Sequence, residues 1–168
     1  MDINGNIKES DENVLEDPLL GYLVDGVLNN RHTRTVTFDG WCFVDDFLVA
    51  RLKRIIDTTG AKIVLSSTWR DGWNREDESK NAPFFNQLRD KLKEYGMEIW
   101  DALPLPLQQN RGLAIAEWFE SHKDLNIESF VILDDWYDMG IYRDHLIWIN
   151  GNIGLTDEDV AEAINYMK

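Results

Sequence analysis

Residues 62–70 read Lys-Ile-Val-Leu-Ser-Ser-Thr-Trp-Arg, and this stretch decides the predicted fold. Its apolar part lacks the alternation of a half-exposed strand, which favours a strand covered on both faces, as in a parallel sheet. Open α/β sheets bind ligands beyond the carboxyl ends of their strands. Ser66, Ser67 and Arg70 follow the strand and are therefore candidate ligands of an anion. The alternative is that Ser67 or Thr68 only caps a following helix.

The composition predicts one soluble domain. The chain has 168 residues, of which 43% are hydrophobic and seven are Trp, so a substantial core can form. Seventeen basic and 31 acidic side chains give a formal charge of −14, which disfavours non-specific binding to nucleic acid. No apolar run approaches the roughly 20 residues that cross a bilayer, so no membrane contact is expected. The single Cys42 and the absence of an apolar signal segment favour a cytoplasmic location.

Residues 1–18 differ in composition from the rest of the chain. They carry six acidic side chains and one lysine, with few apolar residues to bury. This pattern predicts an acidic flexible leader. A single domain is expected over residues 19–168.

Beyond the leader, strand patterns and helix patterns alternate, which is typical of a parallel α/β sheet. Apolar runs predict strands at 18–24, 63–65, 97–100, 130–133 and 145–149. Helical periodicity predicts helices at 45–57 and 83–95, one beginning near Arg111, and a last one that Thr156 caps. Residues 35–38 alternate as in a small hairpin or flap, and residues 71–82 are predicted to form a polar loop.

Polar side chains follow three of these strands, and a basic residue begins the helix before the fourth: Asp25, Ser66, Ser67, Asp134, Asp135 and Arg111. Adjacent carboxylates repel each other unless a cation or water relieves them. Mg²⁺ is often held by one or two carboxylates plus a phosphate, and hydroxyls and arginine complement the phosphate itself. Each residue alone also has an ordinary explanation, a turn for the acidic pair and a surface position for the arginine. Together they predict a magnesium and phosphate site.

These motifs resemble the haloacid-dehalogenase-like (HAD) phosphohydrolases, and most of all the compact HAD domains of Swiss Army Knife RNA-repair proteins. The resemblance covers residues 19–167. It rests on residues 23–29 (Leu-Val-Asp-Gly-Val-Leu-Asn), 63–70, 111–112 (Arg-Gly), 130–135 (Phe-Val-Ile-Leu-Asp-Asp) and 154–156 (Gly-Leu-Thr). It implies a three-layer, Rossmannoid parallel sheet with a small flap and no large cap domain.

The resemblance also implies roles for individual residues. Ser66 and Arg111 would bind and stabilise the phosphoryl group, in a pocket that Ser67 and Arg70 extend. Asp25 would match the general acid/base, with its main-chain carbonyl facing the metal. The metal, Mg²⁺, would be held with the help of Asp134 and Asp135, directly or through water. The implied substrate is a nucleotide or a terminal phosphate of a nucleic acid.

The first motif departs from the family pattern, because the nucleophile position, two residues before Asp25, holds Leu23. A leucine cannot attack phosphorus, and it removes one metal ligand. In a second register Asp25 would be the nucleophile and Val27 would occupy the acid's place, but Gly26 after Asp25 fits the first register better. Two functions therefore remain: a Mg²⁺-dependent phosphohydrolase, or a catalytically impaired pseudoenzyme that binds a phosphorylated ligand or a protein partner.

Three tryptophans lie close to these motifs in the sequence, at Trp69, Trp73 and Trp136. They could stack on a nucleobase or pack inside the protein. Packing is the commoner role of an aromatic side chain.

Overall fold

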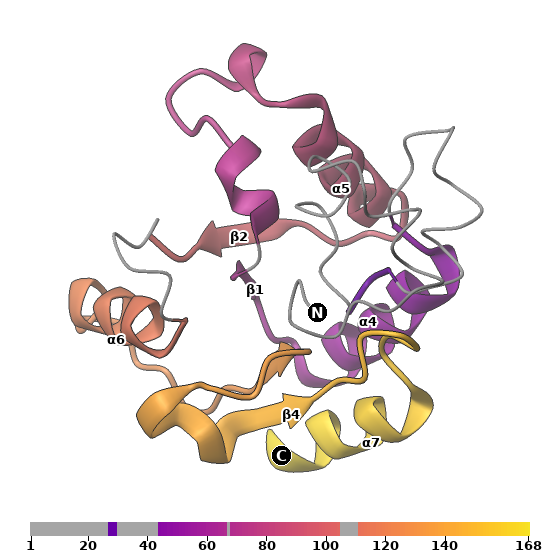
Figure 1. Ribbon diagram of the computed structural model, residues 1–168, viewed down its shortest axis with the longest axis vertical. Coiled ribbons are helices and arrows are strands. Elements are labelled where there is room, and N and C mark those ends of the chain that lie inside the picture. Colours follow the sequence, from indigo (N-terminus) through magenta and orange to yellow (C-terminus); the bar gives the residue numbers. More distant parts are fainter. Residues whose placement is uncertain (1–26, 30–43, 67, 105–110) are drawn as a thin grey trace, which may run out of the picture.

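The computed structural model describes residues 27–29, 44–66, 68–104 and 111–168 (Figure 1). The acidic leader, the strand expected at 18–24 and the flap expected near residues 35–38 lie outside the described residues. The same holds for Leu23, Asp25 and Ser67, three positions that matter for the predicted site.

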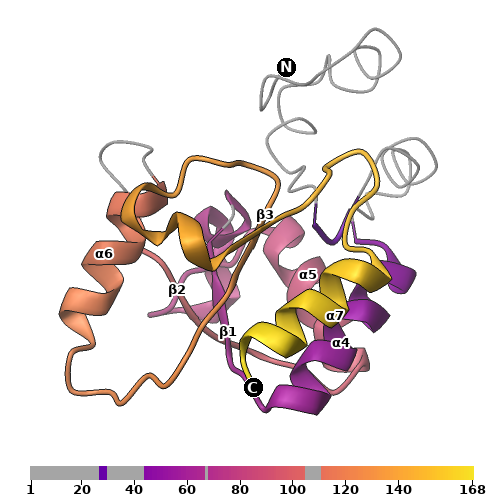
Figure 2. The ribbon, with the colours of Figure 1, turned by 90° about the horizontal axis from the view of Figure 1, so that it is seen from below.

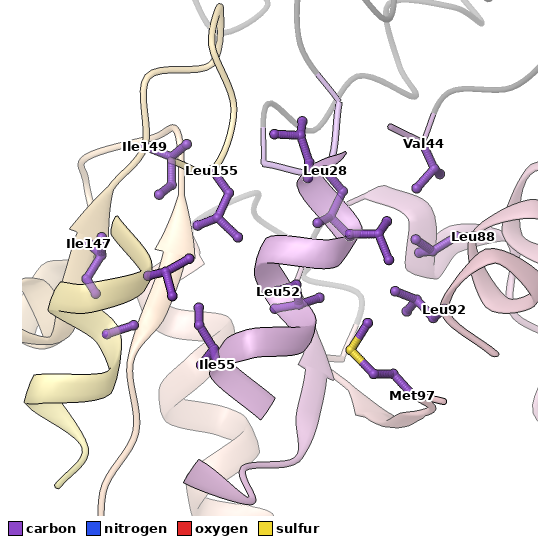
Figure 3. Close-up of a cluster of buried hydrophobic side chains, with 14 of the residues drawn as sticks. Leu28, Val44, Leu52, Ile55, Leu88, Leu92, Met97, Ile147, Ile149 and Leu155 are labelled. Carbon is purple, nitrogen blue, oxygen red and sulfur yellow. The ribbon is translucent and has the colours of Figure 1, made fainter. Parts of the chain in front are cut away.

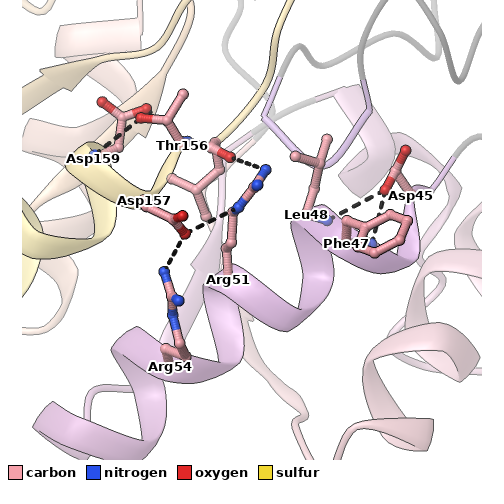
Figure 4. A network of polar contacts seen from close by, with 9 residues as sticks. Asp45, Phe47, Leu48, Arg51, Arg54, Thr156, Asp157 and Asp159 are labelled. Carbon is pink, nitrogen blue, oxygen red and sulfur yellow. Dashed lines mark hydrogen bonds and ion pairs between the residues drawn. The ribbon is translucent and has the colours of Figure 1, made fainter.

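The helices expected from the sequence are confirmed. Their bounds are α4 (Asp46–Thr59), α5 (Pro83–Glu94), α6 (Arg111–Ser121) and α7 (Asp157–Tyr166). Asp45 caps α4 by accepting from the backbone of Phe47, and α4 ends at Gly60, whose φ of 71° is left-handed. Thr156 caps α7 in a capping box, and both caps are visible in Figure 4. Within the described ranges, no helix is long and apolar enough to cross a membrane.

The strands form two parallel pairs among the described residues. They are β1 (Ile63–Leu65), β2 (Ile99–Ala102), β3 (Ile132–Asp134) and β4 (Leu146–Trp148), with β1 paired to β2 and β3 paired to β4. The first agrees with the prediction, whereas β2 and β3 begin two residues later than expected. Each contains an aspartate that is buried and paired with an arginine: Asp101 within β2 and Asp134 at the end of β3. In the sequence, an acidic residue marks the end of an apolar strand pattern. In the structure, Asp101 and Asp134 remain part of their strands, because each is paired with an arginine.

The polar segment predicted as a loop at 71–82 contains short helical turns. The 3₁₀ helix η1 (Thr68–Gly72) ends in this segment, and η2 (Glu78–Lys80) lies within it. A third 3₁₀ helix, η3 (Gly140–His145), lies elsewhere in the chain, directly before β4. Gly72 O accepts from Ala82 N at 2.9 Å, so the segment between them closes on itself before α5 begins.

The strands are covered on both faces, as the sequence predicted for β1. The larger apolar cluster joins α4, α5 and α7 to alternate strand residues: Ile63, Leu65, Leu133 and Ile147. Figure 3 shows its buried side chains, among them Leu52 of α4, Leu88 of α5 and Ile147 of β4. The smaller cluster joins α6 to the residues between them: Val64, Ile132 and Leu146. Figure 2 shows α4 and α7 on one side of the strands and α6 on the other. Because the strands of each pair run parallel, β1 ends beside β2 and β3 ends beside β4.

The described end of the first motif, residues 27–29, is held between α4 and the loop before α7. Val27 O accepts from Leu155 N at 3.1 Å, and Leu28 O accepts from Asp45 N at 2.8 Å. Gly154 permits this approach: its φ is +83°, and a Cβ there would lie 2.6 Å from a Leu48 methyl and 3.2 Å from Val27 O. The first and last motifs of the sequence, more than 120 residues apart, therefore meet in the fold.

Candidate functional site

Arg111 and Asp134 form an ion pair at the edge of the sheet. Arg111 is the first residue of α6, and its guanidinium donates to Asp134 Oδ2 at the end of β3. The Asp134 side chain is only 4% exposed, while that of Arg111 is 25% exposed. The other carboxylate oxygen, Oδ1, accepts from Trp136 N at 2.9 Å. The buried charge is thus paired and hydrogen-bonded, which is the condition for keeping it ionised.

A second guanidinium lies close to this pair. Arg70, in η1, donates from Nη1 to the carbonyl oxygen of Ser66, directly after β1. Its burial, and secondarily the positive charge of Arg111, lower the pKa of Arg70 to about 10. Arg70 therefore remains a cation at neutral pH, but a partly desolvated one that is repelled by its neighbour. An anion between the two arginines would relieve this repulsion.

The contacts link four residues that the sequence analysis selected. The carbonyl oxygen of Ser66 accepts a hydrogen bond from Arg70, and the positive charge of Arg111 repels that of Arg70. Arg111 in turn forms an ion pair with Asp134. The group thus contains a half-buried serine, two guanidiniums and a buried carboxylate. Planar guanidiniums and a hydroxyl are the donors that complement the oxygens of a phosphate. The structure thus brings Ser66, Arg70, Arg111 and Asp134 close together.

Asp135, the residue after Asp134, lies against the loop that follows β4. A Cβ on Gly151 would lie 2.7 Å from Asp135 Oδ2, so the carboxylate faces the loop that follows β4. Trp148 Nε1 donates to Asp135 O at 3.0 Å, and Ile149 N donates to Asp134 O at 2.8 Å. The two acids are therefore anchored to β4 through their main chains. Asp25 and Ser67, the remaining predicted site residues, lie outside the described residues.

Two adjacent carboxylates at a strand end fit Mg²⁺ in the type of their donors, because hard oxygen ligands are what this ion prefers. Both oxygens of Asp134 already accept a hydrogen bond, but each carboxylate oxygen has a second lone pair. Within the described ranges, which exclude Asp25, no group of three or more Asp, Glu, His or Cys side chains could hold a metal ion. Asp134 and Asp135 would thus supply the described part of a site whose third acid is expected at Asp25.

A network that the sequence analysis missed supports the site from the side of α6. Asp101 in β2 accepts from Arg75 through Oδ1 and from Trp118 Nε1 at 2.8 Å through Oδ2. His122 Nε2 lies 3.1 Å from Asp101 Oδ2, and the His122 ring stacks on that of Trp118. Arg75 also lies 4.3 Å from the centroid of the Trp73 ring. Because Arg75 follows η1 and Trp118 belongs to α6, the network ties the segment carrying Arg70 to the helix carrying Arg111.

Burial alone would raise the pKa of Asp101, but hydrogen bonds from Arg75 and Trp118 outweigh it and lower the pKa below its ordinary value. Asp101 is therefore a carboxylate at neutral pH. The only sequence signal of the network is the spacing of Trp118 and His122, four residues apart, which places them on one side of a helix.

The three tryptophans near the motifs have different environments. Trp69 is fully buried and meets the Phe84 ring edge-on, with ring centroids 6.3 Å apart. Trp73 stacks on Phe85 at 5.2 Å. Packing, the commoner role, is thus confirmed for these two, whereas Trp136 is 39% exposed next to Asp135.

Comparison with known proteins agrees with the geometry. The sequence model for the HAD domain in Swiss Army Knife RNA repair proteins matches residues 24–160, most of the chain. No curated protein matched the chain, and no solved structure matched it either. The matched range contains all the residues of the candidate site and the described strands and helices up to the first turn of α7. The chain belongs to the family of HAD domains found in Swiss Army Knife RNA repair proteins, and this membership implies a Rossmannoid HAD fold.

Proposed function

We propose that the protein is a Mg²⁺-dependent phosphohydrolase that acts on a nucleotide or on the terminal phosphate of a nucleic acid. The observation that carries the proposal is the proximity of two guanidiniums, Arg70 hydrogen-bonded to the Ser66 carbonyl and Arg111 paired with Asp134, whose charges repel each other. Family membership adds the class of substrate, because the family takes its name from RNA repair.

The described residues support specific roles in binding. Arg70 and Arg111 would bind the phosphate oxygens, and the half-buried Ser66 would add a hydroxyl. Asp134 would keep Arg111 oriented, since the carboxylate already accepts from that guanidinium. The start of α6, whose first residue is Arg111, adds the partial positive charge of a helix N-terminus.

The acids would complete the reaction site. Asp134 and Asp135 would hold Mg²⁺ together with the substrate phosphate, and the ion would neutralise the charge that builds up on the phosphoryl oxygens. Phosphoryl transfer depends mainly on positioning and charge neutralisation, which arginines and carboxylates at one edge of a sheet can supply. Asp25 is the carboxylate that we assign to proton transfer at the ester or water oxygen.

Leu23 favours a second function, a pseudoenzyme that binds a phosphorylated ligand or a protein partner without hydrolysing it. A leucine at the nucleophile position cannot form an aspartyl-phosphate. The groups that bind the anion do not depend on that position, so phosphate binding would survive the loss of turnover.

A phosphatase assay separates the two functions. Release of inorganic phosphate from short 5′- or 3′-phosphorylated oligonucleotides is measured with and without Mg²⁺ for the wild type, Asp25→Asn and Leu23→Asp. A wild-type rate that needs Mg²⁺ and is abolished in Asp25→Asn would support the enzyme. Turnover that appears only in Leu23→Asp would contradict it and support the pseudoenzyme. Asp57→Asn, which changes an exposed carboxylate on α4, is the matched control and should behave like the wild type.

A further inference from the structure

Three exposed aromatic side chains form a cluster at the edge of the sheet. Trp136, Tyr137 and Trp148 are 39%, 48% and 63% exposed. The ring centroids lie 5.2 Å apart between Trp136 and Tyr137, and 5.7 Å apart between Tyr137 and Trp148. Contiguous aromatic surface left in contact with water usually marks a place where something binds.

The cluster is built onto the two acids of the candidate site. Trp148 is the register partner of Asp134 in the parallel pair of β3 and β4, so both lie at the same end of their strands. The indole N–H of Trp148 donates to Asp135 O at 3.0 Å, and the backbone N–H of Trp136 donates to Asp134 Oδ1 at 2.9 Å. The Trp148 ring is therefore hydrogen-bonded to the main chain of Asp135, and the backbone of Trp136 is hydrogen-bonded to Asp134, the acid that pairs with Arg111.

The loop that carries Trp136 and Tyr137 is also pressed against the first turn of α6. A Cβ on Gly112 would lie 2.8 Å from Met139 O, so only a glycine after Arg111 permits this approach. The close contact places the aromatic loop beside the helix end that carries the phosphate-binding arginine.

The aromatic rings and the nearby arginines together favour one class of ligand, a nucleotide. A ring face accepts a nucleobase by stacking, and guanidiniums accept a phosphate, so neighbouring groups of both kinds complement one nucleotide. The net charge of −14 opposes a long polyanion lying across the surface, which favours a short contact at a chain end. A base is free to stack on protein only where it is unpaired.

We propose that Trp136, Tyr137 and Trp148 form a base-stacking platform, which holds the unpaired nucleobase of a single-stranded nucleic-acid end beside its terminal phosphate. This inference rests on the proposed function for the place of the phosphate and adds the strand state and the base contact to it. The platform is sequence-tolerant, because every base presents a π face.

The test compares four probes by isothermal titration calorimetry in the presence of Mg²⁺: inorganic phosphate, ribose 5-phosphate, a 5′-phosphorylated trinucleotide and adenosine. Stacking of one base on an aromatic side chain corresponds to about a tenfold gain in affinity. We therefore expect the trinucleotide to bind about tenfold more tightly than ribose 5-phosphate. Trp148→Ala should remove this advantage and leave the affinity for inorganic phosphate unchanged. Trp148→Phe, which keeps a ring but loses the N–H, should keep most of it.

Tyr166→Ala is the matched control, because Tyr166 is an exposed aromatic residue on α7 whose ring contact is with His145. It should bind all four probes as the wild type does. Equal affinities of the wild type for trinucleotide and ribose 5-phosphate would overturn the platform and leave the phosphate site intact. A Trp148→Ala variant that loses inorganic phosphate as well would overturn it too, since the ring would then only support the loop.

Failure of the proposed function has a different signature. If no phosphate compound binds, the phosphate site is wrong, and the platform is judged on adenosine alone. Adenosine binding that Trp148→Ala abolishes would then support the platform, and absence of adenosine binding would overturn it. Sedimentation of the wild type as an oligomer that Trp148→Ala dissociates would assign the rings to an interface between copies, and would also overturn it.

Discussion

The guanidinium of Arg111, at the start of α6, donates to the carboxylate of Asp134, at the end of β3. The two residues are 23 positions apart, and their pairing joins the start of α6 to the carboxyl end of β3. The same pair has two consequences: it neutralises a buried charge, and it holds a cation at the position where we propose that a phosphate binds.

Removing Arg111 should destabilise the protein, because Asp134 would remain buried without its cation. We expect Arg111→Ala to lower the free energy of unfolding by about 2 kcal/mol, which is less than for a fully buried pair because Arg111 is a quarter exposed. Urea denaturation at pH 7 measures the change. The control is Arg54→Ala, which breaks the exposed ion pair with Asp157 drawn in Figure 4 and should lower the free energy of unfolding much less. Equal losses in the two variants would contradict the buried pair.

Two glycines with left-handed backbones should respond differently to alanine. At Gly60 a Cβ would meet nothing within 4 Å, so Gly60→Ala should cost only the backbone strain of about 1 kcal/mol. At Gly154 a Cβ would also collide with Leu48 and crowd Val27 O. We therefore expect Gly154→Ala to lower the free energy of unfolding by about 3 kcal/mol. Urea midpoints of the two variants measure the difference. Equal destabilisation would show that the loop before α7 is not closely packed against residues 27–29.

The Asp101 network predicts a specific pH dependence. The pKa of Asp101 is lowered in the folded protein, so its ionised form contributes stability above the ordinary carboxyl pKa of about 4, and this contribution is lost as the pH falls through the folded value. Asp101→Asn should therefore destabilise the protein at pH 7. The difference in free energy of unfolding between this variant and the wild type should become smaller below about pH 4. Urea midpoints at pH 7, 5 and 3 measure this. Asp57→Asn, at an exposed site on α4, serves as the control, and a difference that is constant with pH would refute the assignment.

The helices and the first described strand could be predicted because their signals are local. Gly60 after a periodic run marks the end of α4, and Thr156 before three acids marks the start of α7. The first part of the site was also predictable, since residues after parallel strands meet at one edge of a sheet. The pairing of Arg111 with Asp134 was not predicted, because Arg111 begins a helix rather than following a strand.

Other features depend on residues that are distant in the sequence. Arg75 and Trp118 reach Asp101 from different segments, 26 and 17 positions away, and no short pattern indicates this. For the same reason β2 runs through Asp101, which the sequence pattern excludes from the strand. Trp136 is exposed whereas Trp69 is buried, and this difference also results from tertiary packing. In the sequence, both are tryptophans close to a site motif and cannot be told apart.

The most direct test of the phosphate site is the melting temperature of the protein with phosphate, sulfate and a nucleotide at constant ionic strength. A ligand at about 100 times its Kd should raise the melting temperature by roughly 5–10 °C. Because these anions also stabilise proteins generally, each shift is compared with that of Arg111→Ala and Ser66→Ala, relative to each variant without ligand. We expect a clear rise in melting temperature for the wild type and for Arg54→Ala, and a much smaller rise for both site variants. If none of the anions raises the melting temperature, or if both site variants respond like the wild type, the edge formed by Ser66, Arg70, Arg111 and Asp134 is not a phosphate site.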